Sequence, residues 1–412
     1  MKQITGIQRV RPHWREGPLA AWLDAFADWV NALGYAPYTA YRKTLLAACF
    51  SQWLKQEAIV IADITPDHTD RYLRYRWQRL RPCDGDRRAL RQFADFLHQE
   101  GVLSFEAEPA GPMTDAELCV QAYELYLLQT CGLTPATMVN YLPFIRSFLQ
   151  HRFVTGAVTL SSLSADDVVR FVQHMAPELP PKRAKLMTTA LRSFLRYACY
   201  LGEADPDLVA AVPVVANWSM TQIPRGVSPD QVRKLLASID RSSAVGRRDY
   251  AILVLLARLG LRAHEIQFLE LDDIDWANGT LRPWTKGGKR NTFPLSREVG
   301  EAIADYLRHG RQQCRSRRVF LRVKAPIEGF RSSSGIGSVV RHAIERAGVV
   351  APTSGTHQFR HGLATGMLQG GSSLREIGDV LGHCHPDTTR IYAKVDLKAL
   401  RSLALPWPGG VQ

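Results

Sequence analysis

The feature that most constrains the fold is a repeat within the first half of the chain. Four residues recur 98 residues later with the same identity: Gly34, Pro37, Thr39 and Phe50 return as Gly132, Pro135, Thr137 and Phe148. Further along, "ITPDHTDRYL" resembles "LSADDVVRFV" at an offset of 99, and "ALRQF" returns as "ALRSF" at an offset of 101. Offsets this constant predict a duplicated module, and two copies are too few for a solenoid. We therefore expect two lobes suited to gripping something long.

Each copy is predicted to contain four helices, because apolar residues recur at helical spacing in four segments. Thr65 and Ser164 each stand before a helix as an N-cap, with acidic residues in the first turn. The segment "SFEAEPAGPMTD" separates the copies, and a second Pro-rich stretch without helical period ends near residue 222. The expected domains are therefore a helical module at 1–105, a second module at 113–215 and a C-terminal domain at 225–412.

The C-terminal domain is predicted to be helical around a small antiparallel sheet. Ser228 can cap a helix that has Pro229 at its first position, and a mostly apolar helix is interrupted at Gly260. The period then changes in "DIDWANGTLRPWTKGGKRNTFPL", where an Asn-Gly and a Gly-Gly pair mark tight turns between strand-like residues. The predicted fold class is thus mainly α, with two helical modules followed by an α+β domain.

Composition narrows the class of function. The formal net charge is +13 and the isoelectric point lies near 9.6, which indicates a polyanionic partner, most simply nucleic acid, or else a basic surface kept for solubility. No apolar run approaches the roughly 18 residues of a membrane span, and the N-terminus lacks the apolar core of a signal peptide. The seven cysteines are scattered without a CxxC pair, which argues against a disulfide framework and fits the cytoplasm.

Two stretches offer cations that the chain could hold in place. In "GLRAHEI", Arg262 follows the glycine break and Glu265 lies three residues on, so a helix would make them neighbours. Such a pair, taken alone, is usually a surface ion pair. In "TKGGKRNTFPL", Lys286 enters a two-glycine turn and would project from the tip of a hairpin. The alternative is an exposed hairpin with a solubilising lysine.

A third stretch, "THQFRHG", contains a histidine, which can carry a proton, close to an arginine, which carries a fixed positive charge. His357 and Arg360 would share one helical face, and His361 follows them. A histidine beside a guanidinium, which can bind a phosphate with two parallel hydrogen bonds, suits a phosphate site. The alternative is a packed or capping histidine.

The fourth stretch is "LGHCHPDTTRIYAKVD". An upstream S-x-x-E capping box starts a helix that should end at Gly382, so His383 lies just beyond the helix end. Pro386 can open a further helix, which carries Tyr392. His383, Cys384 and His385 are consecutive and lack a partner at metal spacing, so a zinc site is disfavoured. A helix-turn-helix without chemistry is the stronger alternative.

Together these stretches resemble the catalytic domain of the tyrosine recombinases, also called the phage integrase family, over residues 225–400. The family's order Arg, Lys, His-x-x-Arg, His or Trp, Tyr is matched by Arg262, Lys286, His357, Arg360, His383 and Tyr392. Glu265 falls on the acidic position of the family's GLR-x-x-E box, and the spacings are typical of Xer-type members. The second helical module resembles the family's SAM-like core-binding domain. The first module is an extra copy, which could bind flanking DNA as an arm or regulate assembly.

The resemblance implies that a tyrosine oxygen attacks a DNA phosphodiester, which gives a 3′-phosphotyrosyl enzyme and a free 5′-hydroxyl. That link conserves the energy of the broken bond, so neither a cofactor nor a metal ion is expected. The resemblance implies that Arg262 and Arg360 stabilise the charge of the transition state, and that Glu265 orients Arg262. It implies that His357 accepts the proton of the tyrosine and that Lys286 protonates the leaving oxygen. His383 is implied to donate a hydrogen bond to the phosphate.

The expected partner is double-stranded DNA with paired inverted-repeat sites, bound by a homotetramer with or without a second recombinase. The tail at 397–412, which has leucines near helical spacing, is expected to dock on a neighbouring protomer, or else on its own domain. Two other functions stay open. A DNA-binding regulator of the same fold is disfavoured because every chemical position is filled, and a type IB topoisomerase is disfavoured by the repeated module and the Xer-like spacing.

Overall fold

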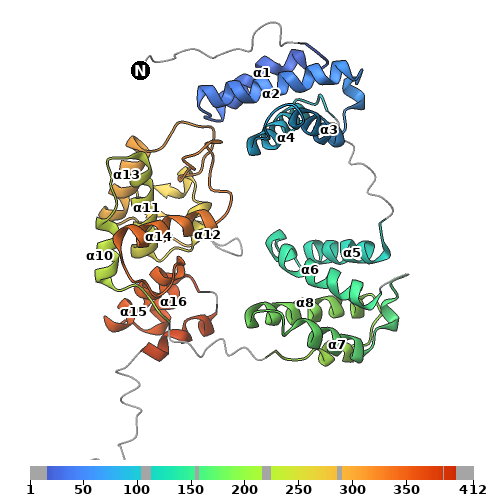
Figure 1. Ribbon diagram of the computed structural model, residues 1–412. Coiled ribbons are helices and arrows are strands. Elements are labelled where there is room, and N and C mark those ends of the chain that lie inside the picture. Colours follow the sequence, from blue (N-terminus) through green and yellow to red (C-terminus); the bar gives the residue numbers. More distant parts are fainter. Residues whose placement is uncertain are drawn as a thin grey trace, which may run out of the picture. The chain divides into compact units, whose positions relative to one another are not determined.

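The computed structural model describes residues 16–103, 113–153, 157–215, 224–284, 290–383 and 385–395 (Figure 1). The chain divides into two compact units. One comprises residues 1–104 together with 222–412, and the other comprises residues 105–221. In the described part of the chain, every helix is too short or too polar to cross a membrane.

The N-terminal module is built from four helices around an aromatic core. Phe26 packs against Phe93 and Phe96, with ring centroids 4.7 and 5.5 Å apart. Thr65 forms the predicted N-cap, within a capping box whose other member is His68. The elements are η2 (Ala20–Trp22), α1 (Leu23–Ala32), α2 (Pro37–Gln56), the 3₁₀ turn η3 (Ile61–Asp63), α3 (Pro66–Trp77) and α4 (Asp84–Gln99).

The second unit repeats this order of elements, which confirms the predicted pair of helical modules. A 3₁₀ turn again precedes the third helix, and Ser164 again caps that helix through a capping box. A short additional helix, absent from the sequence prediction, follows the fourth. The elements are α5 (Asp115–Gln129), α6 (Pro135–Arg152), η4 (Leu160–Ser162), α7 (Ala165–Met175), α8 (Pro181–Tyr200) and α9 (Asp207–Ala211).

The C-terminal part surrounds one apolar helix. Residues 251–256 of α11 are fully buried, because α10, α13, α14 and α15 all pack against this helix. Ser228 caps α10 with Pro229 at its first position, as predicted. The helices are α10 (Pro229–Ala237), α11 (Ala244–Leu259), α12 (Ala263–Gln267), α13 (Arg297–His309), α14 (Ser334–Ala347), α15 (His357–Gln369) and α16 (Leu374–Leu381), with the 3₁₀ turns η5 (Leu271–Asp273), η6 (Pro386–Thr388) and η7 (Arg390–Val395).

The predicted small antiparallel sheet is present, with strand order β1-β2-β3. Leu281 lies opposite both Ile274 and Phe293, and all three side chains are buried on the side of the core. Gly279, at φ +61°, makes the turn between the first two strands. The strands are β1 (Ile274–Asp275), β2 (Thr280–Leu281) and β3 (Phe293–Pro294).

The segment that carries Tyr392 differs from its prediction. The sequence suggested one helix from Pro386 onward, whereas the structure has two short 3₁₀ turns, η6 and η7. The backbone N–H of Tyr392 donates to the carbonyl of Thr389, three residues back. Thr389 is buried, and its hydroxyl is engaged by His383. The 3₁₀ turns thus leave Thr389 within hydrogen-bond distance of His383.

Candidate active site

The break between α11 and α12 positions Arg262. Gly260 has φ +60°, and a Cβ there would lie 2.9 Å from Leu363 Cδ2, so the position needs glycine. Arg262 then becomes the N-cap of α12. Its backbone N–H donates to Glu265 Oε2 at 2.8 Å, and its guanidinium donates to Oε1 at 2.8 Å. Since Glu265 is only 2% exposed, Arg262 is held by a buried carboxylate and does not form an ordinary surface ion pair.

Arg360 is held by the carbonyl ends of two helices. Its Nη1 donates to the carbonyl oxygen of Gly260 at 2.8 Å, and its Nη2 donates to that of Leu381. The side chain is 4% exposed. Burial, followed by the charge of Arg262, lowers the pKa of Arg360 to about 10, so the guanidinium still carries its charge at neutral pH. Among the described residues, Arg360 is held by two carbonyls and no carboxylate, and it therefore adds its charge to a site that also holds the Arg262–Glu265 ion pair.

The two predicted histidines are neutral at physiological pH. Burial, and then the charges of Arg360 and Arg262, lower the pKa of His357 and lower that of His383 to about 4. His383 Nδ1 lies 2.7 Å from Thr389 Oγ1. When Thr389 donates in this hydrogen bond, Nε2 of His383 carries the ring proton and can be offered to an anion.

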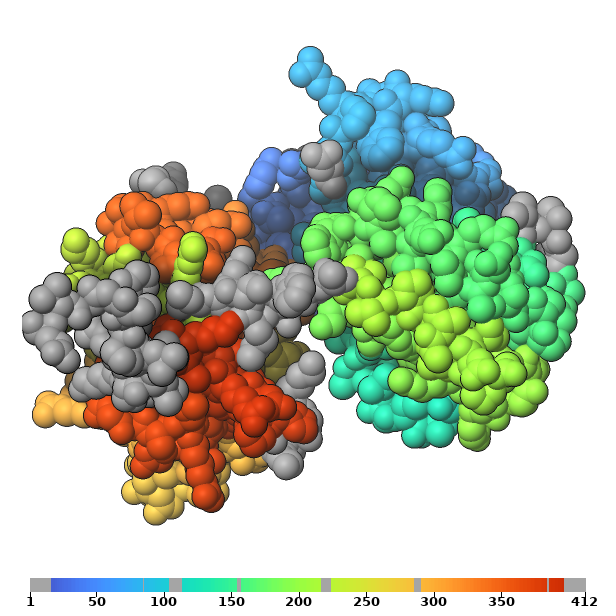
Figure 2. All heavy atoms as spheres, turned by 90° about the horizontal axis from the view of Figure 1, so that it is seen from below, coloured from blue at the N-terminus to red at the C-terminus, as the bar shows by residue number. Residues whose placement is uncertain are grey.

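Tyr392 is only 1% exposed and packs against Ala364, Ile377 and Leu381. The last described helices form part of the surface of the C-terminal part, coloured red in Figure 2, while the tyrosine ring lies beneath it. Burial raises the pKa of Tyr392, and the two arginines oppose this rise. Its hydroxyl lies 3.0 Å from His361 Nδ1. The nucleophile expected from the sequence is thus hydrogen-bonded inside the protein.

His361 had no role in the sequence prediction. The printed pattern "HQFRH" places it four residues after His357, one helical turn further along α15, and this spacing was its only signal. The rings of His357 and His361 have centroids 6.4 Å apart. Within the described residues, the hydroxyl of Tyr392 has its hydrogen bond with His361 and none with His357.

The base of the predicted lysine hairpin lies beside the His383 loop. Trp284 and Arg290 pair across the hairpin, and Arg290 stacks 4.1 Å from the centre of the Trp284 ring. Asn291, the next residue, lies so close to Gly382 that a Cβ there would come within 1.8 Å of Asn291 Nδ2. Three predicted features lie outside the described residues: Lys286 with its two-glycine turn, Cys384, and the tail at 397–412.

The geometry thus gathers six residues of the predicted set from four separate segments. They are Arg262, Glu265, His357, Arg360, His383 and Tyr392, which α12, α15, the end of α16 and η7 contribute. Two fixed guanidinium groups, neutral imidazoles and one buried phenol can receive a phosphodiester and attack it.

Comparison with known proteins identifies the class. Residues 225–398 match the phage integrase family, and residues 120–200 match the SAM-like N-terminal domain of phage integrases. A protein of Sinorhizobium fredii named as an integrase/recombinase, y4rA, is 52% identical over 397 residues, which cover 96% of each chain. The chain therefore belongs to the phage integrase family, the tyrosine recombinases.

More distant relatives agree with this assignment. The tyrosine recombinase XerD of Mycobacterium tuberculosis is 30% identical over 316 residues, covering 72% of this chain and 98% of XerD. Among solved structures, XerH bound to a palindromic difH substrate superposes with a TM-score of 0.56 at 18% identity, covering 81% of this chain and 93% of XerH. A lambda integrase dimer on a core site gives a TM-score of 0.52 at 17% identity, covering 67% and 94%. At these identities the two structures show a shared fold.

Proposed function

We propose that this recombinase cuts and rejoins DNA at specific sites through a covalent bond between Tyr392 and a 3′-phosphate. The observation that carries the proposal is the convergence of Arg262 and Arg360, each held by protein acceptors, on the site of a buried tyrosine. The 52% identity to an integrase/recombinase over nearly the whole chain supports the same reaction.

The arginines are proposed to stabilise the phosphorane transition state. Negative charge grows on the non-bridging oxygens as the tyrosine attacks, and preorganised donors stabilise it without rearranging. Glu265 acts as a positioning residue, because it binds both the backbone and the guanidinium of Arg262. Removing one such donor typically costs about 3 kcal/mol of transition-state stabilisation.

The remaining groups are proposed to bind the phosphate and complete proton transfer. His357 and His383, both neutral beside the arginines, donate hydrogen bonds to the non-bridging oxygens. Lys286, carried by the hairpin whose base lies beside the His383 loop, protonates the 5′-oxygen as it leaves. The reaction exchanges one phosphodiester for another, so its energy stays in the tyrosyl link and no cofactor is required.

Strand exchange joins two duplexes, so we propose a homotetramer on paired inverted-repeat sites, in which a second recombinase can replace some of the protomers. One structural relative is a lambda integrase tetramer bound to a Holliday junction, with a TM-score of 0.52. The proposed organisation is an extra module at 1–105, a core-binding module at 113–215 and a catalytic domain at 225–412. The tail at 397–412 is proposed to dock on a neighbouring protomer. The cytoplasm, where bacterial DNA lies, is the proposed place of action.

The test uses a nicked suicide duplex whose site has been selected by the protein from random-sequence DNA. We expect the unmutated chain to form a covalent complex at a 3′-end. The Tyr392→Phe variant should bind the same duplex and form no adduct. Binding without an adduct by the unmutated chain would instead support a catalytically silent regulator. Relaxation of any supercoiled plasmid, whatever its sequence, would support a topoisomerase.

A further inference from the structure

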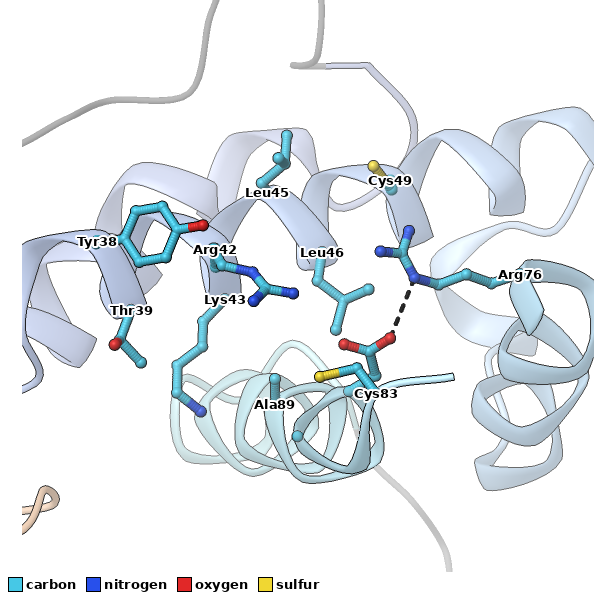
Figure 3. Close-up of a pocket in the computed structure, with 12 residues that line it drawn as sticks. Tyr38, Thr39, Arg42, Lys43, Leu45, Leu46, Cys49, Arg76, Cys83 and Ala89 are labelled. Atoms are coloured by element: carbon cyan, nitrogen blue, oxygen red, sulfur yellow. Dashed lines mark hydrogen bonds and ion pairs between the residues drawn. The ribbon is translucent and has the colours of Figure 1, made fainter. Parts of the chain in front are cut away.

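The N-terminal module has a basic face between two packed helices. Arg42 and Lys43 stand on α2, and Arg88 and Arg91 stand on α4, which packs against α2. Together with the exposed Tyr38 they form what we call the α2–α4 basic face. Figure 3 shows Arg42 and Lys43 extending from α2 over a pocket of about 240 Å³. This volume is smaller than the roughly 300 Å³ at which pockets for drug-sized ligands begin.

The arginines on this face lack acidic partners, unlike several other arginines of the module. Among the side chains that the structure describes, Arg42, Arg88 and Arg91 have no carboxylate within ion-pair distance, although all three are exposed. On α3, by contrast, Arg71 and Arg74 pair with carboxylates at 3.5 and 3.7 Å. Residues 16–103 contain eleven basic and eleven acidic residues, so the positive face arises from segregation of charge and not from an excess.

Like charges also approach one another across the two helices. Lys43 is half-buried, and its ammonium donates to the neutral Gln92 at 2.6 Å, which in turn donates to Tyr35 at 2.9 Å. Burial, and then the charge of Arg88, lower the pKa of Lys43. Grouping cations without an acid carries an electrostatic cost in the free protein. A bound polyanion would remove that cost, which is the pattern expected of a phosphate-binding surface.

Two residues that line the pocket form an ion pair. Arg76 reaches from α3 to Asp86 on α4 with a separation of 3.3 Å, and both side chains are largely buried. Asp86 is thereby paired with Arg76, which is not one of the residues of the basic face. The basic residues above it remain available to a ligand.

We propose that the α2–α4 basic face binds the phosphates of duplex DNA next to the segment held by the catalytic domain. This inference rests on the proposed function for the identity of the polyanion, and it gives the extra module a role in gripping DNA. The alignments with y4rA and a second Sinorhizobium fredii relative each cover 96% of this chain, so they include the module. The XerD relative covers only 72% of it.

The test measures DNA affinity against salt concentration with the full chain, in a Tyr392→Phe background that cannot cleave. The variant Arg42→Ala/Arg88→Ala/Arg91→Ala removes three cations from the face. The matched control, Arg71→Ala/Arg74→Ala/Arg79→Ala, removes two from α3 and one from the turn that follows it. Each lost phosphate contact lowers the slope of log affinity against log salt by about 0.9. We expect the slope to fall by about 2 to 3 for the first variant and to stay unchanged for the control.

A hydroxyl-radical footprint on the same duplex should lose one protected segment in the first variant only. Equal slopes and equal footprints for the two triple variants would overturn the proposal. Because all six arginines are exposed, the thermal midpoints should match that of the parent. Adduct formation by the same variants with Tyr392 restored tests the proposed function separately. Adducts with unchanged slopes would refute only the DNA-binding face.

A second and independent inference concerns the proton of the nucleophile. The hydroxyl of Tyr392 lies 3.0 Å from His361 Nδ1, and the two rings meet edge to face with centroids 5.8 Å apart. His357 and Arg360 precede His361 on α15, and His383 and Arg262 lie at the same site. Burial, followed by His357 and Arg360, lowers the pKa of His361. A neutral imidazole has one free lone pair, which suits it to accept a proton.

We infer that His361, and not His357, accepts the proton of Tyr392 during cleavage. The O–H bond of the phenol breaks, and its proton moves to His361 Nδ1. The phenolate oxygen then forms a bond to phosphorus, while the bond from phosphorus to the 5′-oxygen breaks. Lys286 supplies the proton to that oxygen, and the reverse steps restore both groups during rejoining. This step rests on the proposed function.

The assay is single-turnover cleavage of the suicide duplex by the full chain across a range of pH. His361→Gln keeps a side chain that can hydrogen-bond but cannot take the proton. We expect it to cleave about 100-fold more slowly or worse, in line with the usual contribution of a general base. The unmutated rate should fall at low pH as His361 becomes protonated, and His361→Gln should lose this acid limb.

A duplex with sulfur in place of the bridging 5′-oxygen separates the two proton transfers, because a thiolate leaves without protonation. It should restore cleavage by Lys286→Ala and leave His361→Gln slow. The inference fails if His361→Gln keeps both the rate and the acid limb while His357→Gln loses them. Absence of any adduct from the unmutated chain would instead refute the proposed function. Equal thermal midpoints for His361→Gln and the parent exclude loss of the fold.

Discussion

Gly382 allows the turn that carries His383, and replacing it should damage both stability and catalysis. Its φ is +63°, in the left-handed region, and an added Cβ would lie 1.8 Å from Asn291 Nδ2 and 3.0 Å from Asn291 Cγ. The left-handed conformation alone costs alanine about 1–2 kcal/mol. Relief of the contact requires a further movement of about 1 Å or more, shared between the Asn291 side chain and the turn, and displacements of this size can reduce rates by on the order of 100-fold.

Gly348 offers a matched control, because it also ends a helix at φ +59° and has open space where its Cβ would stand. We expect Gly348→Ala to lower the free energy of unfolding by about 1 kcal/mol and to cleave normally. Gly382→Ala should lose more stability and cleave between about 10- and 100-fold more slowly. Adding Asn291→Ala should bring its stability back to that of Gly348→Ala. Chemical denaturation and single-turnover cleavage measure these effects. Equal cleavage rates for Gly382→Ala and Gly348→Ala would refute the reasoning.

Three further predictions follow from the same site. Arg360→Lys removes a planar guanidinium that donates to the carbonyl oxygens of Gly260 and Leu381. Cleavage should fall about 100- to 1000-fold. DNA affinity, measured by gel shift, should change little. The pKa of His383 is lowered to about 4 from its ordinary 6.5. As pH falls, this histidine therefore becomes protonated in the unfolded chain before it does so in the folded chain. The free energy of unfolding should therefore fall as pH drops from about 6.5 to about 4, with a shallower slope in His383→Asn. Thr389→Val removes the partner of His383 Nδ1 and should slow cleavage about 10-fold without a change in affinity. An unchanged rate would show that Thr389 does not set the ring's orientation.

The parts of the fold that sequence analysis predicted well depend on local rules. Ser228 and Ser373 each cap a helix by exchanging hydrogen bonds with the residue three positions later. Gly260 ends α11 because glycine adopts the left-handed conformation easily. The four-helix repeat was visible because duplicated residues keep the same caps and the same buried positions. These signals lie within a few residues of one another, so one sequence suffices to read them.

The parts that it missed depend on contacts between distant segments. Arg360 bonds the carbonyl of Gly260, one hundred residues away, and no local pattern indicates this pair. The contact between His361 and Tyr392 requires α15 and η7 to pack together. The Arg262–Glu265 pair was predicted from spacing, but its burial depends on how α12 meets α14. The tyrosine segment, which has the 3₁₀ form, likewise packs against α15 and α16, a contact that no local pattern indicates.

The central claim is that Tyr392 becomes linked to DNA. Protease digestion of the complex formed on the nicked suicide duplex, followed by mass spectrometry, identifies the linked residue directly. We predict a single nucleotide-bearing peptide modified at Tyr392 through a 3′-phosphate, together with a free 5′-hydroxyl on the released strand. Attachment at another residue, or through a 5′-phosphate, would contradict the account.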